Sequence, residues 1–155
     1  MTQQRLFILI AALGSASLLA GAFGFQYIGG LAPCALCIWQ RWPHALAVII
    51  GLIAFVFPQR GLAWLGAAAA LGSAAIGVFH VGVEQKLWAG LASCTASSMD
   101  GASIEDLLNP EISIAAPIHC DAIAWQMLGI SMAGWNVLIS LVLVGLWLRA
   151  ARQTA

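Results

Sequence analysis

The chain has 155 residues, of which 62% are hydrophobic and only 8% are charged, and its mean hydropathy is +0.95. A soluble domain carries about 25% charged residues, so this composition excludes a water-soluble globular protein and indicates a membrane protein. The formal net charge is zero, and we therefore expect no nucleic-acid partner, since nucleic acids are bound by basic surfaces.

Four apolar runs are candidates to cross the roughly 30 Å of bilayer hydrocarbon, which takes about 20 helical residues. They lie at about residues 6–25, 42–58, 62–81 and 131–148. Only helices and closed barrels satisfy the backbone in lipid. The sequence therefore predicts an all-α membrane protein with one domain over residues 1–155, a four-transmembrane-helix bundle. The second run is the shortest and would gain a turn by starting nearer Cys37.

The first run also has features of a secretory signal, because it follows Arg5 and contains the small residues Ala20, Gly21 and Ala22. Its apolar stretch continues to Phe25, however, and three further runs follow. We therefore expect an uncleaved first helix.

The positive charges at the ends of the runs predict the orientation, because Lys and Arg favour the cytoplasmic side. One set of ends carries Arg5, Arg60, Arg149 and Arg152. The opposite set carries Arg41 and Lys86. We expect a multi-pass protein of the bacterial inner membrane, with both termini in the cytoplasm and two periplasmic loops at about residues 26–41 and 82–130.

The second loop contains a short amphipathic pattern. Apolar side chains recur with helical spacing at Ile104, Leu107 and Leu108, after a candidate N-cap at Ser103 and before Pro110. We predict a short amphipathic helix here, which lies on the membrane surface or packs on the protein.

All four cysteines fall in the two outer loops, with Cys34 and Cys37 in the first and Cys94 and Cys120 in the second. The outer side is where disulfides persist, and an even number of cysteines favours pairing. A Cys-x-x-Cys motif can form a strained, accessible disulfide of the labile, oxidising kind. Two static structural disulfides remain an alternative. Structural zinc would need a second close pair, so we expect no metal.

Arg41 follows Cys37 by four residues, so in a helix the two side chains share a face. A charge in or near the membrane is usually functional, and this one would stabilise a Cys37 thiolate and hold a carbonyl oxygen of a flat, apolar ligand such as a quinone. The alternative is an arginine that snorkels to the interface. His80, with Glu84 one turn on, is either an exposed interfacial histidine or a proton carrier or quinone contact.

Three stretches of the sequence resemble the bacterial disulfide-bond formation protein B (DsbB) family. The first is Pro33-Cys34-Ala-Leu-Cys37-Ile-Trp-Gln-Arg41-Trp42. The second is Phe79-His80-Val-Gly-Val-Glu84-Gln-Lys-Leu-Trp88, followed by Ala-Ser-Cys94-Thr. The third is Cys120-Asp-Ala-Ile-Ala-Trp125, followed by Leu128-Gly-Ile-Ser131-Met-Ala-Gly-Trp-Asn136. The resemblance extends from about residue 10 to about residue 150.

This resemblance implies a membrane quinone reductase that reoxidises a soluble periplasmic oxidase of the DsbA type, which has a thioredoxin fold. By position, Cys94 would form the mixed disulfide with the partner, and Cys120 would be its loop mate and exchange with Cys34. Cys37, beside Arg41, would face the quinone. The chemistry and position of Arg41 and His80 make these two the candidate quinone-binding residues. We expect ubiquinone rather than menaquinone.

Three other functions stay open at this point, and one of them is a membrane protein that zinc stabilises. A vitamin K epoxide reductase-like enzyme also uses a helical bundle, a Cys-x-x-Cys motif and a quinone. In that enzyme, however, the pair of loop cysteines precedes the motif in the sequence, whereas here it follows. A non-enzymatic membrane protein with two structural disulfides would keep its cysteines oxidised and inert.

Overall fold

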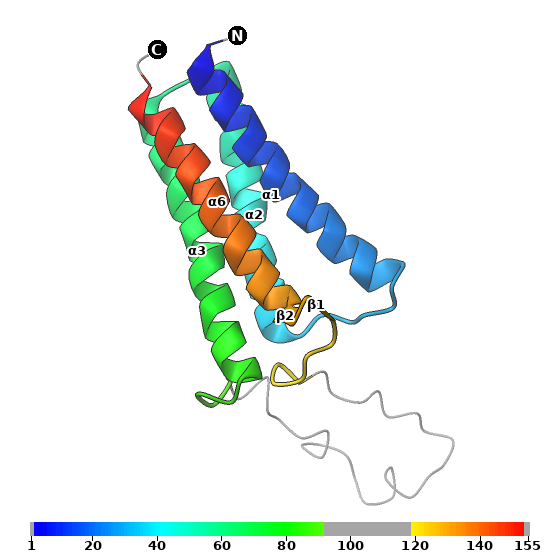
Figure 1. The fold of residues 1–155 in the computed structure, drawn as a ribbon. Coiled ribbons are helices and arrows are strands. Elements are labelled where there is room, and N and C mark those ends of the chain that lie inside the picture. Colours follow the sequence, from blue (N-terminus) through cyan, green and yellow to red (C-terminus); the bar gives the residue numbers. More distant parts are fainter. Residues whose placement is uncertain (1, 92–118, 154–155) are drawn as a thin grey trace, which may run out of the picture.

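The computed structural model describes residues 2–91 and 119–153. These residues form a bundle of four long helices: α1 (Gln3–Tyr27), α2 (Ala35–Val56), α3 (Arg60–Glu84) and α6 (Met132–Arg152). Figure 1 shows both chain ends and the α2–α3 turn at one end of the bundle, which we call the terminal end, and the other connections at the opposite end. Each helix is long and apolar enough to cross a membrane. The predicted four-span helical bundle is therefore confirmed.

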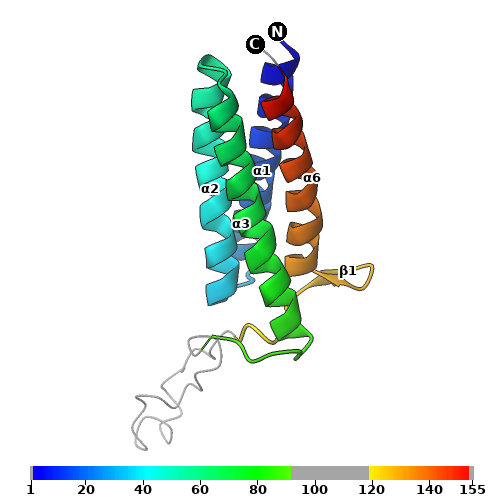
Figure 2. The ribbon, with the colours of Figure 1, turned by 90° about the vertical axis from the view of Figure 1, so that its left-hand side faces the viewer.

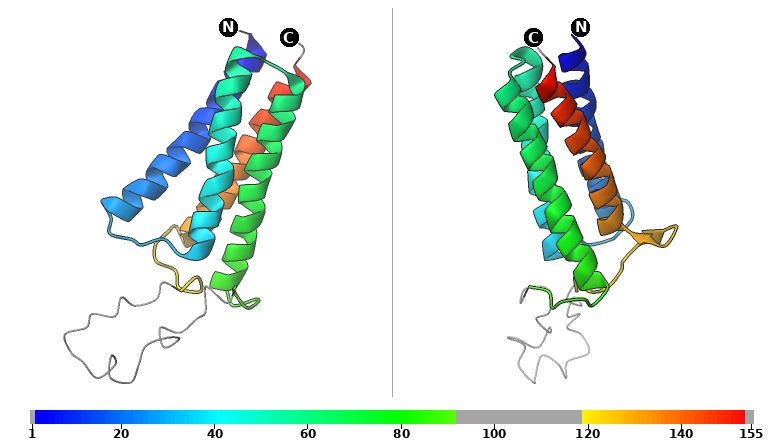
Figure 3. Two further views of the ribbon diagram at one scale, coloured as in Figure 1. Left: turned by 180° about the vertical axis from the view of Figure 1, so that it is seen from behind. Right: turned by 60° about the vertical axis from the view of Figure 1, so that its left-hand side comes forward.

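Each helix packs against two neighbours, since α1 and α3 both contact α2 and α6. Towards its C-terminal end α1 leans away from the other three helices, as Figures 1 and 3 both show. Figure 2 shows α2 and α3 side by side along their length. The bundle is therefore tightest near the terminal end and widest where the loops begin.

The core near the terminal end is a buried apolar cluster around Trp147, which is fully buried. Small residues of the other helices allow this indole to enter the bundle. A Cβ atom added to Gly66 of α3 would lie 2.5 Å from the Trp147 ring, and one added to Gly51 of α2 would lie 2.4 Å from the Cβ of Ala12. Glycine is therefore required for the close approach of these helices.

The second helix begins earlier than the predicted span, at Ala35 instead of about residue 42. Cys34 is its N-cap, and the Cys34 Sγ accepts a hydrogen bond from the Cys37 backbone N–H at 3.2 Å. The helix also continues through Pro43, which membrane helices tolerate because neighbouring groups satisfy the freed carbonyl. The early start places the Cys-x-x-Cys motif on the first turn of α2.

A short hairpin precedes α6, and the sequence analysis did not predict it. Its strands are β1 (Gln126–Met127) and β2 (Ile130–Ser131), which pair antiparallel. Leu128 and Gly129 form the two-residue turn with φ of 54° and 75°, as a type I′ turn requires. Ser131 then caps α6 by accepting the Gly134 N–H. Cys94 and the amphipathic helix predicted at about residues 103–110 lie outside the described residues.

Candidate functional site

Cys34 and Cys37 lie with their sulfur atoms 2.8 Å apart, and both are free thiols. Two sulfurs that share a tetrahedral zinc ion at 2.3 Å would lie about 3.8 Å apart, so the observed spacing favours direct sulfur–sulfur chemistry. The hydrogen bond that Cys34 donates to Cys37, together with burial, raises the pKa of the Cys34 thiol. Within the pair, Cys34 is therefore the sulfur that keeps its proton.

Cys120 brings the second loop onto this motif. Its side chain is fully buried and packs in one cluster with Cys34, Leu36 and Val83. Cys120 is disulfide-bonded, whereas Cys34 and Cys37 are both free. An oxidised cysteine of the second loop therefore lies beside the Cys-x-x-Cys motif.

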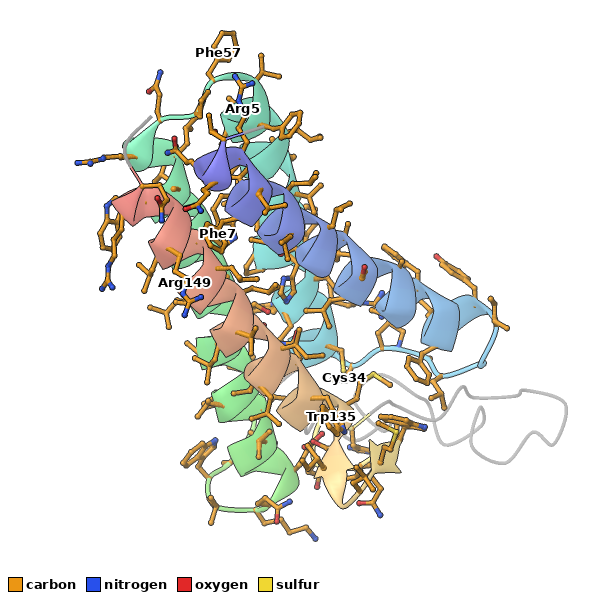
Figure 4. The ribbon with its side chains drawn as sticks, turned by 45° about the horizontal axis from the view of Figure 1, so that its top comes forward. Arg5, Phe7, Cys34, Phe57, Trp135 and Arg149 are labelled. Atoms are coloured by element: carbon orange, nitrogen blue, oxygen red, sulfur yellow. The ribbon has the colours of Figure 1, made fainter. Side chains whose placement is uncertain are left out.

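A cavity of about 460 Å³ opens beside the motif, between the diverging end of α1, the first turns of α2 and α6, and the segment that leads into the hairpin. Its volume lies within the range of small-molecule sites, which is about 300–1,000 Å³. Figure 4 places Cys34 and Trp135, which both line this cavity, at the end of the bundle away from Arg5 and Phe57. Most of its wall is apolar, and its polar lining comes from Ser17, Cys34, Cys37, Gln40, Arg41, His44, His80, Glu84, His119 and Asn136.

Arg41 lines the cavity and also holds α1 to α2. Its guanidinium donates to the Gln26 side-chain oxygen and, at 3.3 Å, to the Ala22 carbonyl, and it lies 5.1 Å from the centre of the Phe23 ring. These two bonds use only part of the five N–H donors of an arginine. The stretch from Cys37 to Arg41 is helical, which is the condition for the two side chains to share a face, and the charge of Arg41 acts on Cys37.

His80 is only 4% exposed, so the interpretation of an exposed interfacial histidine was wrong. Its Nε2 lies 3.6 Å from the Cys34 sulfur and 3.9 Å from Oε1 of Glu84. The ring also hydrogen-bonds the backbone of Cys120. His80 is buried because α3 continues to Glu84 and the segment after residue 118 folds over it. The imidazole thus contacts both cysteine-bearing segments.

The tautomer of His80 is determined by its other neighbour, Gln40. The Gln40 Nε2 lies 3.2 Å from the Leu36 carbonyl and 2.9 Å from Nδ1 of His80. A carbonyl only accepts hydrogen bonds, so the Gln40 atom that faces it must be the amide nitrogen. That nitrogen then donates to Nδ1 of His80, and the proton of the neutral ring is on Nε2, the atom that faces Cys34.

The same argument gives the direction of the whole buried polar network, which continues from Gln40 to α6. The Gln40 oxygen accepts from the Asn136 amide at 2.8 Å, and the Asn136 oxygen then accepts from Nε2 of His44 at 3.0 Å. Ser73 accepts from Asn136 and donates to the Gln40 carbonyl, and Ser140 lies 3.3 Å from Nε2 of His44. The sequence analysis did not single out Gln40, Ser73, Asn136 or Ser140. The signal was their polarity inside apolar runs, with Asn136 and Ser140 one helical turn apart.

Glu84 is a buried carboxylate at the end of α3, where it also lines the cavity. The Ser131 hydroxyl donates to its Oε2, while the Ser131 oxygen accepts the Gly134 N–H. Oε1 faces Nε2 of His80 without reaching hydrogen-bond distance. The hairpin therefore serves to place Ser131 against Glu84 and so joins α3 to the start of α6.

One group of side chains has the composition of a metal site. The ligand atoms of Cys34, Cys37 and His80 all lie within 4.8 Å of one another. They would supply three ligands to a thiophilic ion such as zinc. The short distance between the two sulfurs, which a bound zinc ion would have to widen, favours thiol chemistry at this place.

Known proteins resemble this chain over most of its length. The chain matches the family described as "Disulfide bond formation protein DsbB" over residues 4–150. Disulfide bond formation protein B of Dechloromonas aromatica (strain RCB) is 35% identical over 133 residues, which cover 82% of this chain and 79% of the relative. The protein of that name in Stutzerimonas stutzeri (strain A1501) is 32% identical over 157 residues, which cover 92% of this chain and 93% of the relative.

A third relative, disulfide bond formation protein B 2 of Pseudomonas aeruginosa, is 32% identical over 162 residues, which cover 97% of this chain and 94% of the relative. No solved structure matches the chain. Membership of the family supports a disulfide-forming oxidoreductase, and the four apolar helices make it a multi-pass membrane protein. With its two cysteine-bearing segments joined beside a cavity at one end of a four-helix bundle, the chain belongs to the DsbB family of disulfide bond formation proteins.

Proposed function

We propose that this protein is a quinone-dependent protein-disulfide oxidoreductase, which reoxidises a soluble DsbA-like thiol oxidase. The observation that carries the proposal is the position of Cys34 and Cys37, between the buried Cys120 and an apolar cavity of about 460 Å³. An electron source and a binding site for a flat, apolar acceptor thus lie on either side of one dithiol.

The proposed path has four steps. The partner dithiol reduces the disulfide of the second loop through a mixed disulfide with Cys94. The reduced Cys120 then attacks Cys34 of the Cys34–Cys37 disulfide, against which it packs, and releases Cys37. Cys94 next displaces Cys34 from Cys120, so the loop disulfide forms again and Cys34 and Cys37 are left as a dithiol. This dithiol gives two electrons to a quinone in the cavity and becomes a disulfide again.

The inequality of the two thiols supports Cys37 as the residue that meets the quinone. Cys34 keeps its proton because it donates to Cys37, so the negative charge of the reduced pair resides on Cys37. A thiolate is the nucleophilic form of cysteine, and Arg41 lies close enough for its charge to act on it.

The proposed orientation places the cysteines in the periplasm and both termini in the cytoplasm. Four of the six Lys and Arg residues of the chain belong to the terminal end or its turn, namely Arg5, Arg60, Arg149 and Arg152. This bias supports a cytoplasmic terminal end under the positive-inside rule. The disulfide of Cys120 then lies on the oxidising side of the membrane.

The decisive experiment combines the purified protein with a reduced DsbA-like oxidase and a soluble benzoquinone. We expect catalytic formation of hydroquinone and oxidised partner, and loss of both in Cys37→Ser. A Cys120→Ser variant should accumulate a mixed disulfide between Cys94 and the thioredoxin-fold partner. If Cys37→Ser retains full quinone reduction, the proposed path is wrong.

A further inference from the structure

Quinone reduction needs protons as well as electrons, so the cavity should contain a group that transfers them. Among the described residues that line it, the titratable or charged ones are Cys34, Cys37, Arg41, His44, His80, Glu84 and His119. α2 and α3 supply all but His119, and α1 and α6 contribute no titratable group to the lining. The Cys34 thiol is a source of these protons, and five groups remain to consider besides the two cysteines.

Four of these five are less suited than Glu84, for different reasons. The guanidinium of Arg41 does not lose its proton in proteins. Nδ1 of His80 is occupied by the Gln40 amide, so a second proton on the ring would break that bond. His44 has an Nδ1 without a partner, but it lies two helical turns beyond Cys37 along α2, and His119 is exposed to solvent rather than held in the bundle.

In Glu84, one carboxylate oxygen is held by a hydrogen bond and the other is not. Oε2 accepts the Ser131 hydroxyl, and this bond holds the carboxyl group in place. Oε1 lies 3.9 Å from Nε2 of His80, beyond hydrogen-bond distance, so it is available to take and release a proton. A buried ionisable residue in a membrane helix is costly and is usually retained for function.

We propose that Glu84 is the proton-transferring residue of this cavity, and that its Oε1 accepts a thiol proton and passes it to an oxygen of the bound quinone. This inference rests on the proposed function. As the Cys34–Cys37 bond forms, the Cys34 thiol and the Cys37 thiolate lose two electrons and one proton. The quinone gains the two electrons, that proton through Glu84 and a second proton from water, and becomes hydroquinone. Glu84 gives up each proton that it accepts, so it ends the reaction as it began.

His80 has a different role in this arrangement. With its proton on Nε2, the ring is a fixed donor that faces the Cys34 sulfur, Oε1 of Glu84 and the backbone of Cys120. It is therefore a positioning residue, which aligns the thiol and the carboxylate. Ser131 positions Glu84 from the opposite side.

The test separates the two halves of the reaction in single-turnover measurements on the full-length protein. The first measurement follows the reduction of a soluble benzoquinone after it is mixed with fully reduced protein under anaerobic conditions. The second follows reduction of the oxidised protein by dithiothreitol, detected by thiol labelling. Glu84→Gln keeps the shape of the side chain and an acceptor for Ser131, but it cannot carry a proton.

We expect Glu84→Gln to slow quinone reduction by at least about tenfold, since general acid–base groups commonly contribute about 10²- to 10⁴-fold. Reduction by dithiothreitol should stay within about twofold of wild type. Between about pH 5 and about pH 9 the wild-type rate should follow an ionisation that the variant lacks. Glu84→Asp should recover part of the rate, and Asp121→Asn, which removes an exposed charge at the same end, should match wild type.

Each outcome decides the assignment. If the wild type reduces the benzoquinone and Glu84→Gln reduces it at the same rate, the role of Glu84 is overturned and the proposed function stays intact. Equal slowing of both half-reactions would show a structural role and would also overturn it. Failure of the wild type to reduce the benzoquinone would overturn the proposed function, and the inference with it.

Discussion

Cys34 donates a hydrogen bond to Cys37 across 2.8 Å, and the two thiols of the motif are therefore unequal. Cys34 also receives the Cys37 backbone N–H, which on its own would favour a thiolate. The bond to Cys37 and burial outweigh it, so the pKa of Cys34 is raised. The dithiol therefore has one sulfur that keeps its proton, that of Cys34, and one that can carry charge, that of Cys37.

We predict that iodoacetamide labels Cys37 before Cys34 in the reduced protein at about pH 7, because the thiolate is the reactive form. A raised pKa keeps Cys34 protonated where an ordinary cysteine, near 8.5, begins to ionise. The difference in labelling should therefore shrink as the pH rises well above that value. Peptide mass spectrometry after timed quenching measures both rates.

Cys37→Ser is the matched control for this experiment, because it removes the sulfur to which Cys34 donates. Cys34 should then react faster at the same pH. If Cys34 is labelled first in the unsubstituted protein, the assignment of the charged end is wrong.

Gln40→Met should destabilise the protein, because it keeps a side chain of similar length while removing the centre of the polar network. Nδ1 of His80 and the amide of Asn136 would each lose a partner. A buried polar group without its partner costs about 1–3 kcal/mol. We expect a lower free energy of unfolding in mixed micelles and slower quinone reduction.

Leu46→Met is the control for Gln40→Met, since that side chain lies on the same helix and is exposed. It should leave the stability unchanged. An unchanged stability in Gln40→Met itself would mean that water or a rearranged Asn136 replaces the amide.

Arg41→Lys should weaken quinone binding although it preserves the charge. A lysine cannot reproduce the fork that reaches both Gln26 and Ala22 while leaving donors for a ligand. One lost charge-assisted hydrogen bond is worth about 1.5–3 kcal/mol, so the KM for a soluble benzoquinone should rise about tenfold or more. Reduction by dithiothreitol should be unaffected.

Arg60→Lys, at the terminal end of α3, is the corresponding control and should behave like wild type. A wild-type KM in Arg41→Lys would show that only the charge of Arg41 matters.

Gly66→Ala should destabilise the bundle, because the new methyl group would lie 2.5 Å from the Trp147 ring. Overpacking of a tight core costs about 1–3 kcal/mol. Gly72→Ala on the same helix meets no atom within 4 Å and removes a residue with poor helix propensity, so it should be neutral or stabilising. The free energies of unfolding of Gly66→Ala and Gly72→Ala can be compared in mixed micelles. If the two substitutions change the free energy of unfolding equally, α3 does not pack closely on Trp147.

Sequence alone was sufficient for the parts of the fold that depend on hydrophobicity and charge. The four spans follow from the apolar runs, and the motif at Cys34 and Cys37 follows from its spacing. The predicted second span followed the apolar run at about residues 42–58, so it began later than α2 does. In the structure, the Cys34 cap and the neighbouring helices satisfy that first turn.

The polar interior could not be predicted in the same way, because it depends on which faces of three helices meet. Gln40, Ser73 and Asn136 come from α2, α3 and α6, and no local pattern relates them. The burial of His80 likewise depends on the segment that contains Cys120, which lies 40 residues further along the chain. A polar side chain within an apolar run indicates a buried partner, but it does not say which one.

The position of the polar network has a consequence for the passage of protons along the bundle. From Gln40 the network runs through Asn136 to His44 and Ser140, and His44 is its titratable member. Beyond Ser140 the described interior becomes the apolar cluster around Trp147. The network therefore stops within the bundle and does not connect the cavity with the terminal end.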